Sequence, residues 1–134
     1  MSSPLSPDQI ASLAKQYSQF ATTINDFLDN NDVPDPDYTD LRDAASQCAT
    51  AAANLTIEAA VTQFSDSDAA FGSLSQVTTA ANQAAFGIKK QAASIKRTLS
   101  IATGLLSLAA GLVSGSPATV VSAIASLHGT LWGS

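Results

Sequence analysis

The stretch IKRTLSIATGLLSLAAGLVSGSP, residues 95–117, decides how this chain folds. Its last cation is Arg97, and no Asp, Glu, Lys or Arg follows before the end of the chain. Apolar residues recur through it at steps of three and four, as on one face of an α-helix. The GSP at 115–117 can end that helix with a left-handed glycine and start another with a cap and a proline. The stretch therefore predicts an uncharged helical hairpin over 98–132.

The same three-four pattern extends far upstream of this stretch. It begins at Phe71 and continues to Val113, over 43 residues without a proline. One helix of that length would span roughly 65 Å at 1.5 Å per residue. The sequence thus predicts a single long helix over 66–114, with a kink or break at Gly87 or Gly104 left open because glycine lowers helix propensity.

Start and stop signals divide the rest of the chain. SPDQ at 6–9 combines a cap, a proline at the first helical position and a capping-box Gln, and NNDVPDPD at 30–37 interrupts the helix that follows. No strand pattern competes. We expect one all-α domain over 1–134, an elongated up-down bundle of four helices with a C-terminal hydrophobic hairpin. The predicted helices cover 6–30, 36–64, 66–114 and 117–131.

Composition predicts an ordered chain with a thin core. Charged residues make up 13% of the chain, about half the usual quarter, so disorder is disfavoured. Hydrophobic residues reach 46%, but many are Ala, and aromatic residues are only 6%. No signal peptide is visible at the N-terminus, because it has neither a basic start nor an apolar run. We expect a soluble or peripherally membrane-associated protein.

Charge is distributed unevenly along the chain. All eleven acidic residues precede Phe71, and six of them lie between Asp26 and Asp40. Four of the six basic residues lie beyond Phe71, where there is no acid. The two halves should attract each other, and the pattern lacks the broad basic face of a nucleic-acid-binding protein.

The residues that usually carry catalysis are scarce. Cys48, Glu58 and His128 are the only residues of their kinds, and no third group is suggested that would orient a Cys–His pair. Cys48 is interpreted as a small buried hydrophobic residue. The aspartates between Asp29 and Asp40 lack the central Gly and closing Glu of an EF-hand loop. We therefore expect a non-enzymatic protein with no catalytic residue, metal ligand, cofactor or small-molecule substrate.

The uncharged hairpin and the cations before it are the candidate functional surface. Small residues on the long helix predict close packing against the next helix, as between helices in lipid; these are Gly104, Ser107, Gly111 and Gly115. The surface itself is expected to meet membrane lipid, a partner helix, or a second copy of the chain in a homo-oligomer. It comprises Lys89, Lys90, Lys96, Arg97, Leu99, Leu105, Leu106, Leu108, Leu112, Val113, Val120, Ile124, Leu127, Leu131 and Trp132.

Two functional hypotheses follow from this surface. Each apolar segment has about 15–17 residues, short of the ~20 that span a bilayer, so a conditionally inserting hairpin is favoured over a permanent span. The cations would lie at anionic headgroups and Trp132 at the opposite interface. In layout, residues 89–134 are similar to helical pore formers, which carry a hydrophobic hairpin within a soluble helical body. The alternative is a soluble assembly module that buries the same surface against another helix.

Overall fold

The computed structural model describes residues 4–58, 64 and 66–132, and within these ranges it contains five α-helices and no strand. The all-α prediction is confirmed, but the predicted number of four helices is wrong. The helices are α1 (Pro7–Asn30), α2 (Asp37–Glu58), α3 (Ser67–Phe86), α4 (Ala92–Ser114) and α5 (Pro117–Trp132). The sequence predicts that the second helix continues to residue 64, but positions 59–63 lie outside the described residues.

Helix α1 begins at a complete capping box. The Gln9 backbone N–H donates to Ser6 Oγ at 3.2 Å, and the Ser6 N–H donates to Gln9 Oε1 at 2.9 Å. Pro7 occupies the first helical position, where its missing N–H costs no intrahelical bond. This local chemistry satisfies donors that a helix start would otherwise leave unpaired.

The predicted long helix over 66–114 is wrong, because the chain breaks between Phe86 and Ala92. Gly87 ends α3, and its N–H points back to the carbonyl oxygens of Ala84 and Ala85. The Lys89 N–H then donates to Ser94 Oγ at 2.9 Å, which fixes the start of the next helix. Of the two glycines at which a break stayed open, Gly87 breaks the helix and Gly104 lies inside a continuous α4.

Coverage of the apolar seam explains the break. An unbroken rod of roughly 65 Å would extend far past α1, whose 24 residues span about 36 Å. Reversing the chain at Gly87 places both halves of the seam beside α1 and α2. Leu74 and Val77 from α3 and Ile101 and Leu108 from α4 are then all buried in one core. Burial of these side chains favours two short helices over one long helix.

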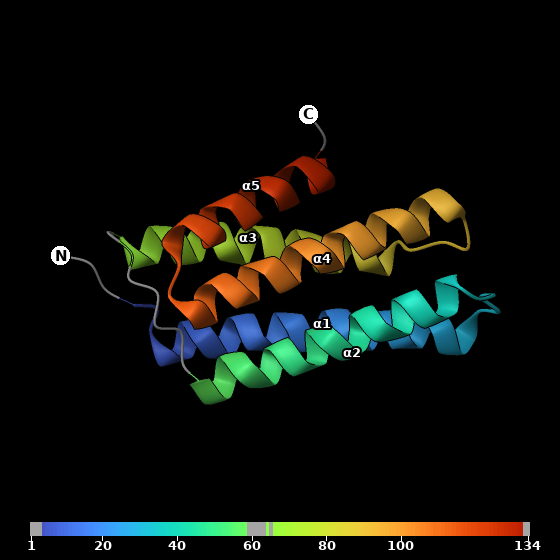
Figure 1. The fold of residues 1–134 in the computed structure, drawn as a ribbon, viewed down its shortest axis with the longest axis horizontal. Helices are drawn as coiled ribbons and strands as arrows, with labels where there is room; N and C mark the ends of the chain where they lie inside the picture. Colours follow the sequence, from blue (N-terminus) through green and yellow to red (C-terminus); the bar gives the residue numbers. More distant parts are fainter. Residues whose placement is uncertain (1–3, 59–63, 65, 133–134) are drawn as a thin grey trace.

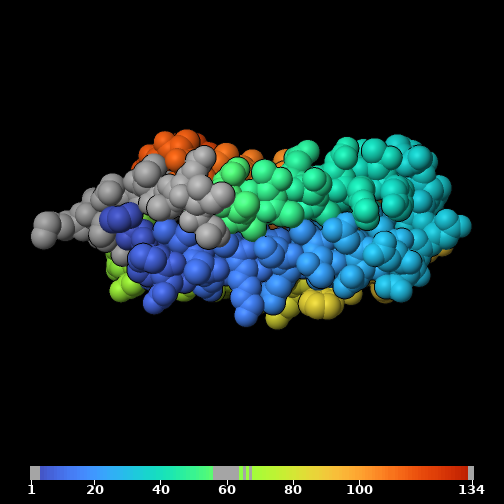
Figure 2. All heavy atoms as spheres, turned by 90° about the horizontal axis from the view of Figure 1, so that it is seen from below, coloured from blue at the N-terminus to red at the C-terminus, as the bar shows by residue number. Residues whose placement is uncertain are grey.

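Successive helices run up and down along one long axis (Figure 1). α1 packs on α2 and α3, α2 packs on α4, and α5 lies against both α3 and α4. Seen from below, α1 and α2 lie side by side over the length of the bundle (Figure 2). The α1–α2 and α3–α4 turns lie at the same end, and the α4–α5 turn lies at the opposite end (Figure 1).

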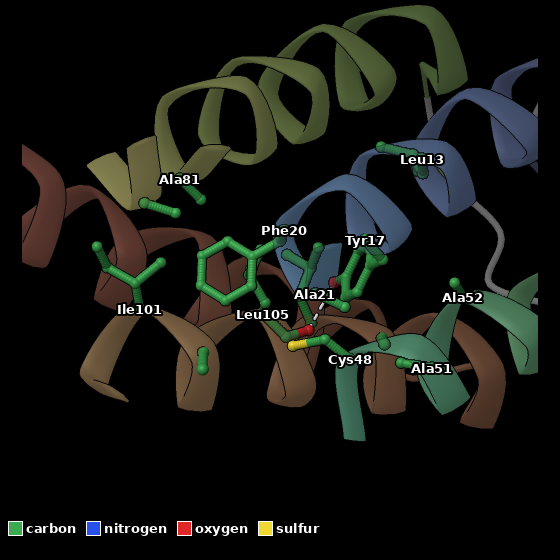
Figure 3. Packing of buried hydrophobic residues seen from close by; sticks show 14 of the residues in the cluster. Leu13, Tyr17, Phe20, Ala21, Cys48, Ala51, Ala52, Ala81, Ile101 and Leu105 are labelled. Atoms are coloured by element: carbon green, nitrogen blue, oxygen red, sulfur yellow. Dashed lines mark hydrogen bonds between the residues drawn. The ribbon is translucent and has the colours of Figure 1, made fainter. Parts of the chain in front are cut away.

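The core combines a few large side chains with many alanines. Figure 3 shows Tyr17 and Phe20 of α1 at its centre, facing Cys48 of α2 and Leu105 of α4. The Tyr17 hydroxyl donates to the Leu105 carbonyl oxygen at 2.5 Å and so joins α1 to α4. Burial raises the pKa of the Tyr17 hydroxyl well above its ordinary value and that of the Cys48 thiol to about 12. Both groups therefore stay protonated at neutral pH.

Candidate functional site: the uncharged hairpin and its basic end

A tight turn folds α4 and α5 into an antiparallel hairpin. Gly115 adopts the left-handed conformation, with φ 79° and ψ 26°, which glycine reaches without steric cost. The N–H groups of Gly115 and Ser116 both donate to the Gly111 carbonyl oxygen, at 3.1 and 3.0 Å. Pro117 then opens α5. The GSP sequence thus acts as an end signal and a start signal within three residues.

Two glycines allow α4 and α5 to approach closely. A Cβ atom at Gly104 would lie 2.6 Å from Leu127 Cδ2, and one at Gly111 would lie 3.0 Å from Val120 Cγ2. The other two small residues lie elsewhere: Gly115 forms the turn, and Ser107 is exposed beside the α4–α5 groove. The hairpin therefore has its own internal interface, which does not involve α1 or α2.

Most large side chains of the candidate surface are covered in the bundle. Five are buried, namely Leu105, Leu108, Leu112, Val120 and Leu127. Five are half-buried, namely Leu99, Leu106, Val113, Ile124 and Leu131. Helix α4 is long and apolar enough to cross a membrane, and half of its most apolar 18-residue stretch is buried in the bundle. Core helices of soluble proteins meet the same criterion, so this property alone does not decide between lipid and a partner.

The four cations gather at the open end of the hairpin. Lys89 and Lys90 are exposed in the α3–α4 turn, and Lys96 and Arg97 are exposed near the start of α4. Arg97 Nη2 donates to the Leu131 carbonyl oxygen of α5 at 3.0 Å. No ion pair joins these four cations to an acidic side chain in the part of the chain that the structure describes.

Trp132 directly follows Leu131, whose carbonyl oxygen accepts the Arg97 hydrogen bond, so it lies near the basic start of α4 in the bundle. The reason is topological: α5 runs back along α4 and ends beside Arg97, short of the α3–α4 turn (Figure 1). Trp132 is 48% exposed, and its ring centroid lies 4.6 Å from that of His128. Cations and an amphipathic aromatic ring therefore share one end of the hairpin, whereas the Gly115 turn at the other end carries no charge.

Sequence reasoning missed the most exposed large hydrophobic residue of the described chain. Phe86 is 79% exposed at the end of α3, immediately before the two turn lysines. A signal for it exists in the sequence, because Phe86 falls between Ala85 and Ile88 of the apolar pattern and so lies off the buried stripe. An exposed phenyl ring beside two lysines extends the candidate surface to the α3–α4 turn.

The acidic α1–α2 turn occupies the same end of the bundle (Figure 1). A hollow of about 300 Å³ lies between the two turns and is lined by Asp26, Phe27 and Asn31 on one side and by Phe86 and Ile88 on the other. Within the acidic segment, Asp35 Oδ1 accepts a hydrogen bond from Thr39 Oγ1 at 2.7 Å. The end of the molecule thus presents both signs of charge on neighbouring turns.

The structure does not bring the potential catalytic residues together. Cys48 is fully buried in the core, whereas His128 is exposed on α5 beside Trp132. The side chain of Glu58 lies outside the described residues. The chemistry of this surface is that of contact, with apolar, aromatic and cationic groups on one hairpin.

No protein-family model, curated protein or solved structure matches this chain.

Proposed function

We propose that this chain is a non-enzymatic, membrane-active helical protein whose α4–α5 hairpin is stored in the bundle and inserts into anionic lipid on release. One observation carries the proposal: the hairpin has its four nearby cations and Trp132 at its open end and no formal charge from Thr98 to its turn and back. An inserted hairpin needs this arrangement, since both of its ends stay at one membrane surface while its turn enters the hydrocarbon.

The open end suits a headgroup layer. Lys or Arg near an anionic surface contributes about 1 kcal/mol each, and Trp is enriched at membrane interfaces. Phe86 and the turn lysines stand beside this end, where the α3–α4 turn would serve as the hinge between bundle and hairpin. The acidic α1–α2 turn opposes the approach to anionic lipid, which limits binding to membranes of sufficient negative charge.

On release from the bundle, the buried face of the α4–α5 hairpin would move from the protein core into the hydrocarbon of the membrane. Leu105, Leu108 and Leu112 are buried in the bundle core, and each such side chain is worth roughly 1.5–3 kcal/mol when removed from water. Lipid removes the same surface from water, so this term nearly cancels. The Tyr17–Leu105 hydrogen bond and core packing remain as the cost of opening. The Gly104 and Gly111 contacts persist, since small-residue interfaces also join helices within lipid.

Vesicle binding tests the proposal with the single Trp as the probe. Vesicles that contain anionic lipid should co-sediment the protein and shift the Trp132 emission to the blue, whereas neutral vesicles should do neither. Absence of both effects on anionic vesicles would refute membrane activity.

A matched pair of variants tests insertion of the hairpin itself. Ser107→Asp places a charge on an exposed α4 position, which the bundle tolerates but hydrocarbon penalises by ~2.5–3.5 kcal/mol at the centre of a span. Ser73→Asp makes the same change on exposed α3, outside the hairpin. We expect Ser107→Asp to lower vesicle leakage and Ser73→Asp to leave it unchanged; equal leakage by both variants would contradict insertion.

A groove between α2 and α4 favours the second candidate, a soluble assembly module. It measures about 490 Å³, and its α4 wall is formed by Leu106, Ala109, Ala110, Val113 and Ser114. No part of the described chain fills it, and its α4 wall is mostly apolar. A partner helix or a second copy would cover this wall.

A further inference from the structure

The side of α4 that faces the α2 groove carries a heptad seam that the described helices of the same chain cover only in part. Its members follow steps of four and three, and each is exposed or half-buried; they are Leu99, Thr103, Leu106, Ala110 and Val113. Alternating four-three spacing is the pattern by which two helices pack along a shared seam. The core-facing leucines and the two packing glycines occupy the other sides of α4. The seam is therefore a third face of α4, whose large side chains pack partly against the core and remain partly open to the α2 side.

The seam forms one wall of a continuous groove along α2. Two hollows, of about 490 and 320 Å³, share Gln47 and Leu106 and so lie end to end. On α2 they extend from Asp40 to Asn54, which is about 21 Å at 1.5 Å per residue. Apart from two aspartates at one end, the α2 wall presents small or uncharged side chains. A length of about 21 Å corresponds to about four turns of an α-helix.

Opposite charges flank the seam at the same end. On the α2 side, exposed Asp40 and Asp43 line the groove beside Leu99. On the α5 side, Arg97 reaches the Leu131 carbonyl, and Lys96 lies one turn before Ser100, which lines the α4–α5 groove. These acids and bases make no ion pair with each other in the described chain.

The other charged residue of this part of α2 points away from the seam. Arg42 Nη1 donates to Asn25 Oδ1 of α1 at 3.4 Å. The seam therefore has an acidic border on α2 and a basic border toward α5, with the uncharged apolar strip between them.

We infer that the α4 seam is the interface of a two-fold homodimer in which the two α4 helices pack in parallel. A two-fold axis along the seam turns the α2 side of one copy toward the α5 side of the other. Asp40 and Asp43 of each copy then face Lys96 and Arg97 of its partner, so the two-fold axis forms this set of opposite charges twice. The contact uses the same patch on both copies and closes on itself. With antiparallel α4 helices, the charged end of each seam would instead meet the far end of its partner's seam, and these opposite charges would not face each other.

The available area is sufficient for a stable pair. The face is about 35 Å long, from the 23 residues of α4, and about 20 Å wide, from two helix spacings of 8–10 Å, which gives roughly 700 Å². Specific interfaces bury about 800 Å² per partner. This inference deepens the assembly candidate and does not rest on lipid binding: a monomer in lipid-free buffer refutes it alone, and absent vesicle binding refutes the membrane proposal alone.

Mass measurement in lipid-free buffer tests the dimer. Sedimentation equilibrium of the wild-type chain should give twice the chain mass of 13.6 kDa. Ala110→Asp changes an exposed seam residue and should yield a monomer, whereas Ala125→Asp changes an exposed alanine on α5 outside the seam and should stay dimeric. Circular dichroism should show equal helix content for both variants. A monomeric wild type, or a dimeric Ala110→Asp variant, would overturn the inference.

A charge exchange tests the parallel arrangement. Asp43→Lys and Lys96→Glu should each weaken the dimer several-fold, since each sets like charges face to face. The double variant restores opposite charges at both ends of the two-fold axis and should recover wild-type association. Failure of the double variant to recover it would overturn the parallel arrangement.

Discussion

The close approach of α4 and α5 predicts that one added methyl group will destabilise the protein. In Gly104→Ala, the new Cβ would lie 2.6 Å from Leu127 Cδ2 and 2.7 Å from Leu127 Cγ, closer than real Cβ contacts allow. Leu127 is fully buried, so the new methyl group forces its side chain to shift within the packed α4–α5 interface. Overpacking of this kind costs about 1–3 kcal/mol. Alanine, however, is favoured over glycine inside a helix by about 1 kcal/mol.

A second glycine separates these two opposing terms. Gly72 also lies within a helix, but a Cβ there would meet nothing within 4 Å. Gly72→Ala should therefore show the propensity gain alone, an increase of about 0.5–1 kcal/mol in the free energy of unfolding. Because both variants share this gain, the difference between them measures the clash, expected at about 1–3 kcal/mol.

Urea unfolding followed by circular dichroism measures both values. Gly104→Ala should unfold at a lower urea concentration than Gly72→Ala, with an unchanged slope. If both variants are stabilised equally, Gly104 is not in close contact with α5, and the internal interface of the hairpin must be abandoned.

Three further predictions concern the core and the charged end. Tyr17→Phe removes the hydroxyl that joins α1 to the Leu105 carbonyl, so the free energy of unfolding should fall by about 1 kcal/mol in urea denaturation. Burial raises the pKa of Cys48 from 9.0 to about 12, so only the unfolded state loses this proton between those values, and stability should fall as pH rises above 9. This term declines by about 1.4 kcal/mol per pH unit, and Cys48→Ala should make pH-dependent unfolding curves less steep. Asp29→Asn with Asp32→Asn removes negative charge from the end that would approach lipid; vesicle titration should show tighter anionic binding, with Asp8→Asn at the opposite end as the unchanged control.

Local chemistry made the helix starts readable from the sequence. Ser6, Pro7 and Gln9 form their capping box from contacts within four residues, so no tertiary information is needed to predict it. The same holds for Gly115, whose left-handed conformation and hydrogen bonds involve only its own turn. Apolar spacing likewise predicted that Leu105 and Leu108 would avoid water, although it could not distinguish a protein core from lipid or a partner.

The sequence left the break at Gly87 open, because the periodicity of apolar residues does not show where the chain reverses direction. The three-four pattern continues through Gly87 without a phase change, and no proline marks the turn. What decides the break is whether α1 and α2 are long enough to cover the seam, which is a property of the whole bundle. The nearness of Trp132 to Arg97 has the same origin: their distance in sequence is large, but the antiparallel hairpin brings α5 back beside Arg97.

The membrane proposal and the dimer compete for the same helix, and this competition follows from geometry. Leu106 and Val113 face the open groove, so either a second copy or lipid can remove them from water, but not both at once. Two of the four cations are likewise shared, since Lys96 and Arg97 would face partner aspartates in the dimer and headgroups at a membrane. A partner or lipid that binds only the dimeric or only the membrane-inserted state lowers the population of the other state. The dimer would therefore be the state in which the hairpin stays buried. Anionic lipid would have to bind Lys96 and Arg97 more strongly than the aspartates on α2 of the partner copy do before α4 could leave the bundle.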